Sequence, residues 1–276
     1  MRARFWARIL VRHGVAIVAE TKNGLLAVQP GDFNVSRSLL ADGEYDWPQI
    51  MWLSRLAEDS SKMIFVGAHI GAVLVPIVRS ASKRNVIAYE PSPRNFRLLA
   101  MNLRLNNLDG VAARNTALGE RAGKIQFTEN HINTGNSRVA RSDGEISVDI
   151  ETLDDTLPAQ WNSVDLIVMD IEGSEVAAMR GAHATLAKTR FLYVEFAPDQ
   201  LHEQGSSAAE FAEIAERYFK SAYIFGCPVL FFGPGKFAQH LKALEHSRGL
   251  LLNVLFTQDS EANPERMINP LPSTVS

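Results

Sequence analysis

The sequence predicts an α/β fold with a Rossmann-like, mostly parallel sheet, helices on both faces and an antiparallel hairpin at one edge. Three observations predict it. Apolar runs of strand length alternate with helical patterns between residues 63 and 196. The runs are almost continuously apolar, as strands buried on both faces are. Glycine or proline turns follow the first two runs, which is typical of strand-to-helix connections.

The expected strands follow from these apolar runs, and the expected helices from apolar residues repeating every three to four positions. Strands are expected at 63–67, 85–90, 111–118, 123–128, 145–150, 164–169 and 190–196, with two more around Gly226-Cys227-Pro228 and a last one at 250–256. Helices are expected after 63–67, after Pro93, after Asp170 and at 208–219. The closely spaced late strands predict the edge hairpin.

Composition limits the function. The chain has 276 residues, which suggests one or two domains of about 150 residues. Its net charge is −3, from 28 basic and 31 acidic residues, so no global field attracts nucleic acid or an anionic membrane. The single cysteine, Cys227, excludes an internal disulfide and argues against a cysteine-based zinc site. It also favours a reducing, cytoplasmic location.

Three parts are expected along the chain: a β-rich extension over 1–62, a core over 63–258 and a flexible tail over 259–276. Turns such as Asn23-Gly24 mark the extension, and a helix near 48–58 closes it. The basic N-terminus has two interpretations, an amphipathic turn touching a membrane surface or a solvated helix packed on the domain. Its apolar run, Val15–Ala19, is too short to span a membrane.

Polar or glycine residues occur where each expected central strand ends. In an open parallel sheet, ligands bind beyond the carboxyl ends of the strands. The residues at these ends are Gly67 to Gly71, Glu90, Asn115 to Ala117, Asp170 with Glu172, and Glu195. Their convergence on one edge predicts a ligand site there.

The glycine turn and Glu90 together indicate a cofactor that contains adenosine. Gly67 and Gly71 let the backbone approach a ligand at a helix N-terminus, although glycine in such a turn also serves packing alone. Glu90 lies 23 residues beyond Gly67, where a carboxylate can accept hydrogen bonds from a ribose diol. The GxxxG spacing disfavours a dinucleotide, which leaves a nicotinamide-dependent oxidoreductase as a less favoured alternative.

Several runs resemble the FkbM-type methyltransferases in order and spacing. The specific ones are YEPSP and DIEGSE with its following MRGA, and the resemblance covers roughly residues 30–258. It implies the class I fold that uses S-adenosylmethionine, and O-methylation of a hydroxyl on a sugar, glycan or secondary metabolite. The resemblance is compatible with an enzyme of that activity and with a binding module built on the same fold.

The resemblance also implies roles for individual residues. Gly67, His69 and Gly71 would lie beside the methionine part of the cofactor, and Glu90 would hold the ribose. Asn115 and Ala117 would lie near the adenine. Asp170 and Glu172 would face the methyl-transfer site.

One position departs from the family pattern. The family has an aspartate two residues before the first glycine and an asparagine two after it, whereas this chain has Phe65 and His69. A phenylalanine cannot accept a hydrogen bond from the amino-acid end of the cofactor. The alternative function is therefore a degenerate homologue that has lost the cofactor and acts as a binding or partner subunit.

The chemistry requires a group that removes a proton from the acceptor hydroxyl. Asp170 and Glu172 are the candidates, because two nearby carboxylates push their pKa values apart. Glu175 either points the same way or stabilises a helix N-terminus. Glu195 either functions at the site or forms a structural ion pair. A divalent metal between these carboxylates is an alternative, although no distinctive spacing supports it.

The loop from His131 to Arg141 is the expected acceptor-binding element. Thr134, Ser137 and Arg138 could hydrogen-bond a polyol or an anionic group, and a merely solvated loop is the alternative. The expected partner is a hydroxyl-bearing small molecule or glycan.

Overall fold

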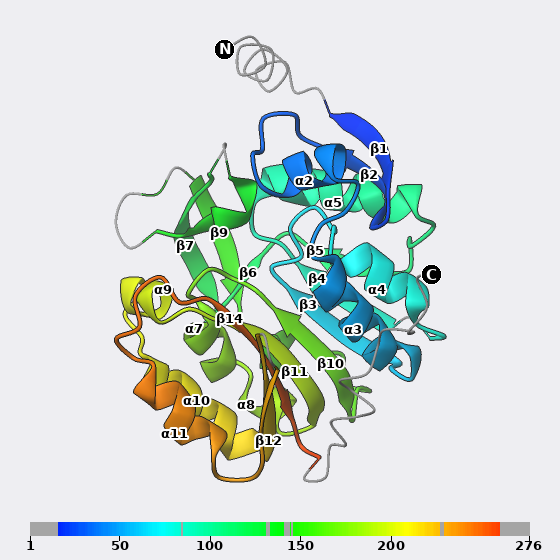
Figure 1. Ribbon diagram of the computed structural model, residues 1–276. Coiled ribbons are helices and arrows are strands. Elements are labelled where there is room, and N and C mark those ends of the chain that lie inside the picture. Colours follow the sequence, from blue (N-terminus) through cyan, green and yellow to red (C-terminus); the bar gives the residue numbers. More distant parts are fainter. Residues whose placement is uncertain are drawn as a thin grey trace, which may run out of the picture.

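The computed structural model describes residues 16–83, 85–130, 133–140, 144, 146–226 and 229–259. At its centre lies an eight-stranded sheet in the order β13-β12-β14-β11-β10-β3-β4-β5 (Figure 1). Five neighbouring strands run parallel: β11 (Thr189–Phe196), β10 (Val164–Met169), β3 (Lys62–Val66), β4 (Asn85–Tyr89) and β5 (Ala112–Arg114). The predicted Rossmann-like sheet is confirmed.

The antiparallel part of the sheet is larger than the sequence indicated. The expected edge hairpin is present as β12 (Ser221–Phe225) and β13 (Leu230–Phe232). In addition, β14 (Leu252–Thr257) lies antiparallel between β11 and β12. Because it pairs on both sides, its apolar run Val254-Leu255-Phe256 is fully buried.

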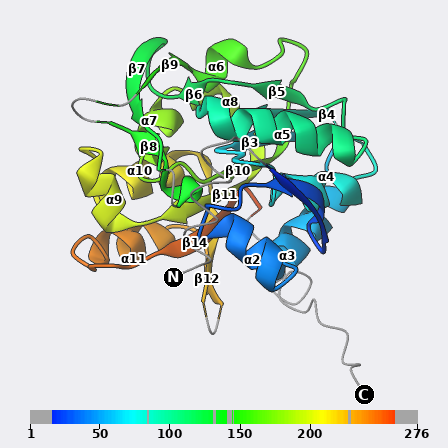
Figure 2. The ribbon, with the colours of Figure 1, turned by 90° about the horizontal axis from the view of Figure 1, so that it is seen from above.

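Alternate residues of the strands face opposite layers of helices. Ile64 and Val66 pack in one core with α7 (Glu175–Arg180), α10 (Ala208–Tyr218) and α11 (Phe237–Ala243). Met63 and Phe65 pack in the other with α3 (Trp47–Glu58), α4 (Leu74–Ser80) and α5 (Pro93–Leu105). Viewed from above, α10 and α11 lie on the opposite side of the sheet from α3 (Figure 2). This two-sided burial explains the continuously apolar strands.

The strand expected over 111–118 is in fact two strands in different sheets. After β5 the chain breaks at Asn115-Thr116 and continues as β6 (Ala117–Leu118). A second sheet has the order β6-β9-β7-β8, with β7 (Gly123–Thr128), β8 (Arg138–Val139) and β9 (Ile146–Glu151). Short helical segments complete this half of the chain: η1 (Thr134–Asn136), α6 (Leu153–Thr156), α8 (His183–Leu186) and α9 (Pro198–Glu203).

The N-terminal extension contains more helix than expected. A hairpin of β1 (Ile17–Thr21) and β2 (Gly24–Val28) precedes α2 (Val35–Ala41) and α3. Apolar residues of β2, α2 and α3 belong to the same core as the sheet, and Asn102 of α5 exchanges two hydrogen bonds with the Ala27 backbone. The division at residue 62 stays a prediction.

Some expectations concern residues outside the described ranges. These are the basic N-terminus, Cys227 and most of the predicted tail, since residues 1–15, 227–228 and 260–276 are not described. Within the described chain, each helix is too short or too polar to cross a membrane.

Candidate functional site

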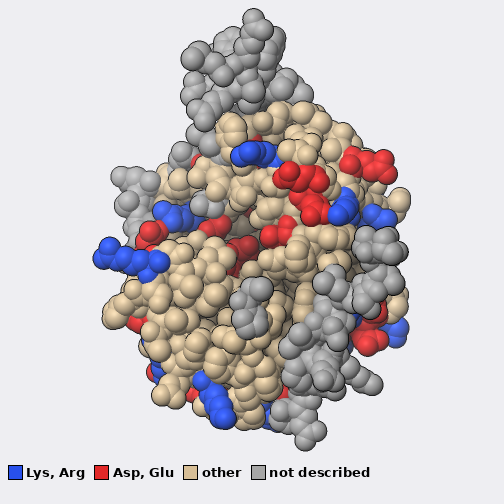
Figure 3. Space-filling model, viewed as in Figure 1, with Lys and Arg blue, Asp and Glu red and all other residues tan. Residues whose placement is uncertain are grey.

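A cavity of about 400 Å³ opens where the central parallel strands end. Its volume lies in the range typical of small-molecule sites, roughly 300–1,000 Å³. Acidic side chains surround the hollow at the centre of this face (Figure 3). The predicted site residues that line it are Gly67, His69, Glu90, Ala117, Thr134, Ser137, Arg138, Asp170 and Glu172. Gly71 and Asn115 are not among the lining residues.

The two glycines of the first turn are explained by packing. Gly67 has φ +82°, and a Cβ there would lie 1.8 Å from the carbonyl oxygen of Asp170. Gly71 has φ +88°, and its Cβ would lie 3.0 Å from Leu99. The Gly67 and Ala68 amides both donate to the Tyr89 carbonyl, and the Gly71 amide donates to Ala68. The backbone of β3 can therefore approach β4 and β10 closely at the floor of the cavity.

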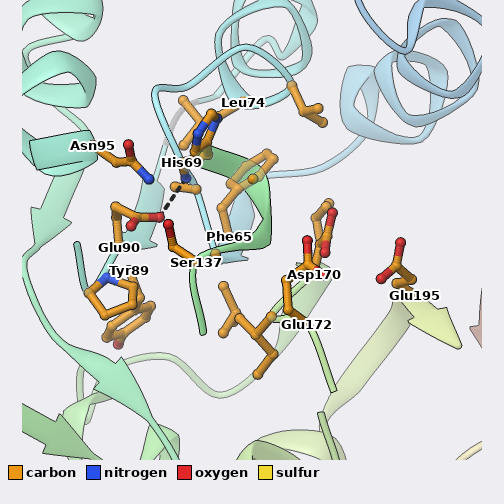
Figure 4. Close-up of a pocket in the computed structure, with 18 of the residues that line it drawn as sticks. Phe65, His69, Leu74, Tyr89, Glu90, Asn95, Ser137, Asp170, Glu172 and Glu195 are labelled. Carbon is orange, nitrogen blue, oxygen red and sulfur yellow. Dashed lines mark hydrogen bonds between the residues drawn. The ribbon is translucent and has the colours of Figure 1, made fainter. Parts of the chain in front are cut away.

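Glu90 follows β4 and is held by the backbone. Its Oε2 accepts a hydrogen bond from the His69 amide at 2.8 Å (Figure 4). Its Oε1 accepts one from the Ser92 amide at 2.9 Å. Burial raises the pKa of Glu90 to about 7, although these two amide bonds oppose the shift. Each oxygen keeps a lone pair with which it can accept a further hydrogen bond.

His69 connects this turn to the loop expected to bind the acceptor. It has φ +51°, and its Nε2 lies 2.8 Å from the Thr134 hydroxyl. Burial lowers the pKa of His69 to about 4, so the ring is neutral at pH 7. The buried Asp32 accepts from the Thr134 amide at 3.1 Å and from the Ser36 amide at 2.7 Å. The Thr134 turn is thus tied both to the glycine turn and to the N-terminal extension.

The side chain of Asn115 is hydrogen-bonded to the backbone, and its predicted place near the adenine stays a prediction. Its side-chain amide donates to the carbonyls of Glu90 and Pro91 at 2.8 and 3.0 Å. It therefore fixes the chain where β4 and β5 end. Ala117, in β6, is the residue of this segment that lines the cavity.

The turn after β10 is strained and locally clamped. Glu172 and Gly173 both have positive φ, +54° and +96°. The buried Glu175 accepts from the amides of Ile171 and Gly173 at 3.0 and 3.3 Å. Of the two alternatives for Glu175, the structure supports a structural one: its carboxylate turns back to hold the loop that presents Asp170 and Glu172.

Three carboxyl groups line the part of the cavity near the ends of β10 and β11: Asp170, Glu172 and Glu195 (Figure 4). Burial is the main cause that raises the pKa of Asp170 to about 6, of Glu172 to about 8 and of Glu195 to about 10. The charge of Asp46 adds to the shift of Asp170, and the charge of Asp170 adds to the shifts of Glu172 and Glu195. At pH 7 Asp170 is mostly ionised, whereas Glu172 and Glu195 are mostly protonated and can donate hydrogen bonds.

The partners of these acids also differ. Glu172 Oε2 accepts from the Gln200 side-chain amide at 2.9 Å. Glu195 Oε2 is buried and has no hydrogen-bond partner within the described chain. The structural ion pair that was one alternative for Glu195 is absent from its described surroundings, so its carboxyl group is available to a ligand.

The expected acceptor loop is partly committed to its own structure. Ser137 donates to the Thr134 carbonyl at 2.9 Å and accepts from the Asn130 amide at 3.0 Å. Arg138 pairs with Glu203 at 2.6 Å. His131 and Arg141, the ends of the predicted loop, are outside the described residues.

Sequence reasoning missed the contribution of the extension to the cavity. Tyr45 and Asp46, immediately before α3, line it together with Phe65. An aspartate shortly before a proline, as in Asp46-Trp47-Pro48, normally indicates a helix cap and gives no sign of a ligand site. In the described part of the chain, no group of three or more His, Cys, Asp or Glu residues is arranged to hold a metal ion.

Comparisons with known proteins agree on one reaction class. The family model described as the methyltransferase FkbM domain matches residues 66–223. The 2-O-methyltransferase NoeI of Sinorhizobium fredii is 28% identical over 172 residues, covering 55% of this chain and 69% of that protein. Methyltransferase 1 of Beauveria bassiana is 27% identical over 146 residues, covering 45% and 59%.

Similarity to solved structures is weaker. An O-methyltransferase from Bacillus cereus in complex with SAH superposes with a TM-score of 0.44 at 11% identity. The superposition covers 80% of this chain and 86% of that one. The curated relatives named above are matched over 59% to 69% of their own lengths.

Proposed function

Because the chain belongs to the FkbM methyltransferase family, we propose that it transfers a methyl group from S-adenosylmethionine to a hydroxyl of a sugar, glycan or secondary metabolite. The observation that carries this proposal is the division of one cavity between a buried, backbone-held Glu90 and a cluster of acids around Asp170. The single cysteine supports a cytoplasmic setting.

The residues of the cavity fit the cofactor. Glu90 has spare lone pairs for the ribose hydroxyls, and the apolar residues Ala117 and Leu118 offer a surface for the adenine. The ionised Asp170 complements the positive charge of the cofactor, and Arg138 is the one lysine or arginine among the described lining residues. When bound, S-adenosylmethionine would supply an electrophilic methyl group on its sulfonium.

Asp170 is the proposed proton acceptor for the hydroxyl. Its pKa of about 6 leaves it ionised at pH 7. This pKa is also closer to 7 than that of an ordinary aspartate, which suits a general base. Glu175 accepts hydrogen bonds from the Ile171 and Gly173 amides and so holds the turn that follows Asp170. This limits the motion of Asp170. Glu172, held by Gln200, would orient the acceptor by donating a hydrogen bond.

A neutral polyol is the acceptor class that this half of the cavity favours. Protonated Glu172 and Glu195 donate hydrogen bonds, and ionised Asp170 accepts one, so together they match a row of hydroxyls. An anionic acceptor would be repelled by the ionised Asp170. Thr134, Ser137 and Arg138 stay proposed acceptor contacts, with their internal hydrogen bonds as the competing role.

The proposal is tested by incubating the protein with methyl-labelled S-adenosylmethionine and two acceptor panels, neutral glycosides and carboxylated glycosides. The expected product is a base-stable methyl ether on a neutral glycoside. Asp170→Asn should abolish it, whereas Asp109→Asn, an exposed position away from the cavity, should not. Only base-labile methyl esters, or no product together with no cofactor binding, would overturn the proposal.

One residue, Phe65, favours a second candidate function. Phe65 is 2% exposed and places an apolar ring where the family has a carboxylate. A degenerate homologue that serves as a binding or partner subunit would bind neither S-adenosylmethionine nor its demethylated product. Binding of either compound would eliminate this candidate.

A further inference from the structure

Asp46 has features that the proposed reaction has not yet used. It precedes α3, has φ +50° and makes no side-chain hydrogen bond to cap that helix. Its side chain instead lines the cavity. A non-glycine residue in the left-handed region costs free energy, and such residues cluster at functional sites.

The backbone before Asp46 is held firmly by Asn23. Asn23 is fully buried, and its side chain accepts from the Tyr45 amide at 3.0 Å and donates to the Tyr45 carbonyl at 2.8 Å. The same side chain donates to the Ala72 carbonyl at 2.9 Å, directly after the glycine turn. The position of Asp46 is therefore tied to the turn that forms the cavity floor.

The order of the strands gives the distance that a ligand held by Glu90 must cross to reach Asp170. Glu90 follows β4, Phe65 lies in β3, and Asp170 follows β10, on three adjacent strands. Neighbouring strands are about 4.8 Å apart, so a ligand anchored at Glu90 crosses about 10 Å to reach the end of β10. At β3 it passes Phe65, whose ring offers no hydrogen-bond acceptor.

Asp46 and Asp170 lie close enough to influence each other. The charge of Asp46 is the second cause, after burial, that raises the pKa of Asp170. Tyr45 and Tyr193 also line the cavity, and the charges of Asp46 and Asp170 contribute to the raised pKa of both. Carboxylates beside aromatic rings form an environment that stabilises a cationic group.

We propose that Asp46 binds the α-ammonium group of the methionine moiety of the cofactor, and so supplies the carboxylate that Phe65 does not. This inference rests on the proposed function and assigns a ligand contact to the N-terminal extension. It leaves Asp170 free to act on the acceptor hydroxyl.

The test compares two ligands by titration calorimetry with the whole chain: S-adenosylhomocysteine and 5′-methylthioadenosine, which lacks the amino-acid end. Asp46→Asn should bind S-adenosylhomocysteine about 10- to 100-fold more weakly, the usual cost of losing a charge-assisted hydrogen bond. Its affinity for 5′-methylthioadenosine should be unchanged. Asparagine tolerates the left-handed region and the helix-cap position, so this variant should fold.

Two further variants separate charge from helix structure. Asp46→Gly removes the carboxylate, tolerates the left-handed region at this position and should show the same selective loss. Asp59→Asn changes the same residue type at the opposite end of α3 and should bind both ligands as the wild type does. An equal loss for both ligands, or no loss for S-adenosylhomocysteine, would overturn the contact.

The outcome also distinguishes this contact from the proposed function. Wild-type protein that binds 5′-methylthioadenosine and S-adenosylhomocysteine equally well would contradict the Asp46 contact alone. Wild-type protein that binds neither would contradict the proposed function, and the Asp46 contact with it.

Discussion

The two halves of the cavity are built differently. We call Gly67, His69 and Glu90 the cofactor half, and Asp170, Glu172 and Glu195 the acceptor half. In the cofactor half both oxygens of Glu90 accept backbone amide bonds, and His69 is held by Thr134. In the acceptor half Glu172 has one side-chain partner, and Glu195 Oε2 has none among the described residues.

This difference separates a pre-arranged site from an adaptable one. Because both donors are backbone amides of the turns that directly follow β3 and β4, the Glu90 carboxyl group is held in place before any ligand binds. Burying a side-chain carboxyl group that has few hydrogen-bond partners costs free energy. This cost remains until a ligand supplies the missing hydrogen bonds. The cofactor half thus suits one constant ligand, and the acceptor half suits a polyol that completes its hydrogen bonding.

The largest effect is expected in the acceptor half, from Asp170→Asn. Without the carboxylate that accepts the hydroxyl proton, kcat should fall about 10²- to 10⁴-fold. Affinity for S-adenosylhomocysteine should change much less, since Glu90 lies two strands away. Steady-state kinetics with an acceptor that the wild type methylates, together with calorimetry, would measure both. Unchanged turnover would remove Asp170 from the mechanism.

The next effect is expected in the cofactor half, from Glu90→Ala. This change removes the ribose contact and leaves the His69 and Ser92 amides without their acceptor. We expect binding of S-adenosylhomocysteine to weaken about 10- to 100-fold. Glu90→Gln keeps a side-chain acceptor and should lose less. Equal affinity in the wild type and Glu90→Ala would show that the ribose binds elsewhere.

The smallest effect concerns stability and pH. Glu90, Glu172, Glu175 and Glu195 have pKa values raised to between about 7 and 10 in the folded state. The protonated groups therefore contribute stability that is complete below their unfolded pKa and is lost as the pH rises through the folded values.

The Tm of the ligand-free protein should accordingly fall between pH 7 and 9, by about 2–4 °C for each kcal/mol lost. His69 contributes little in this window, because it is neutral in the folded state and mostly neutral in the unfolded state above pH 7. Glu195→Gln, which cannot ionise, should have a shallower slope in differential scanning calorimetry. A Tm that rises over this range would mean that the acids are not buried as described.

Local patterns predicted the sheet and the ends of its strands. The apolar runs placed β3, β4 and β10 within one residue of their observed bounds, and parallel strands bring Glu90 and Asp170 to one edge. The prediction of one strand over 111–118 was wrong. The apolar residues of this run belong to two sheets, and the break between the two strands falls at the polar residues Asn115-Thr116. Periodicity alone does not reveal such a break.

Contacts between residues far apart in the chain could not be predicted from the sequence. Asp32 meets Thr134 across 102 positions, and Asn23 meets Ala72 across 49. These partners become visible only when the extension packs against the sheet. The turn clamp by Glu175 is local, but its sequence is equally compatible with a carboxylate that faces the cavity.

The central claim is that this cavity binds an adenosyl cofactor through Glu90. Titration calorimetry of the intact chain with S-adenosylhomocysteine and with NAD tests it most directly. The account predicts one saturable site for S-adenosylhomocysteine, weakened by Glu90→Ala, and no binding of NAD. Binding of NAD, or no binding of S-adenosylhomocysteine, would contradict it.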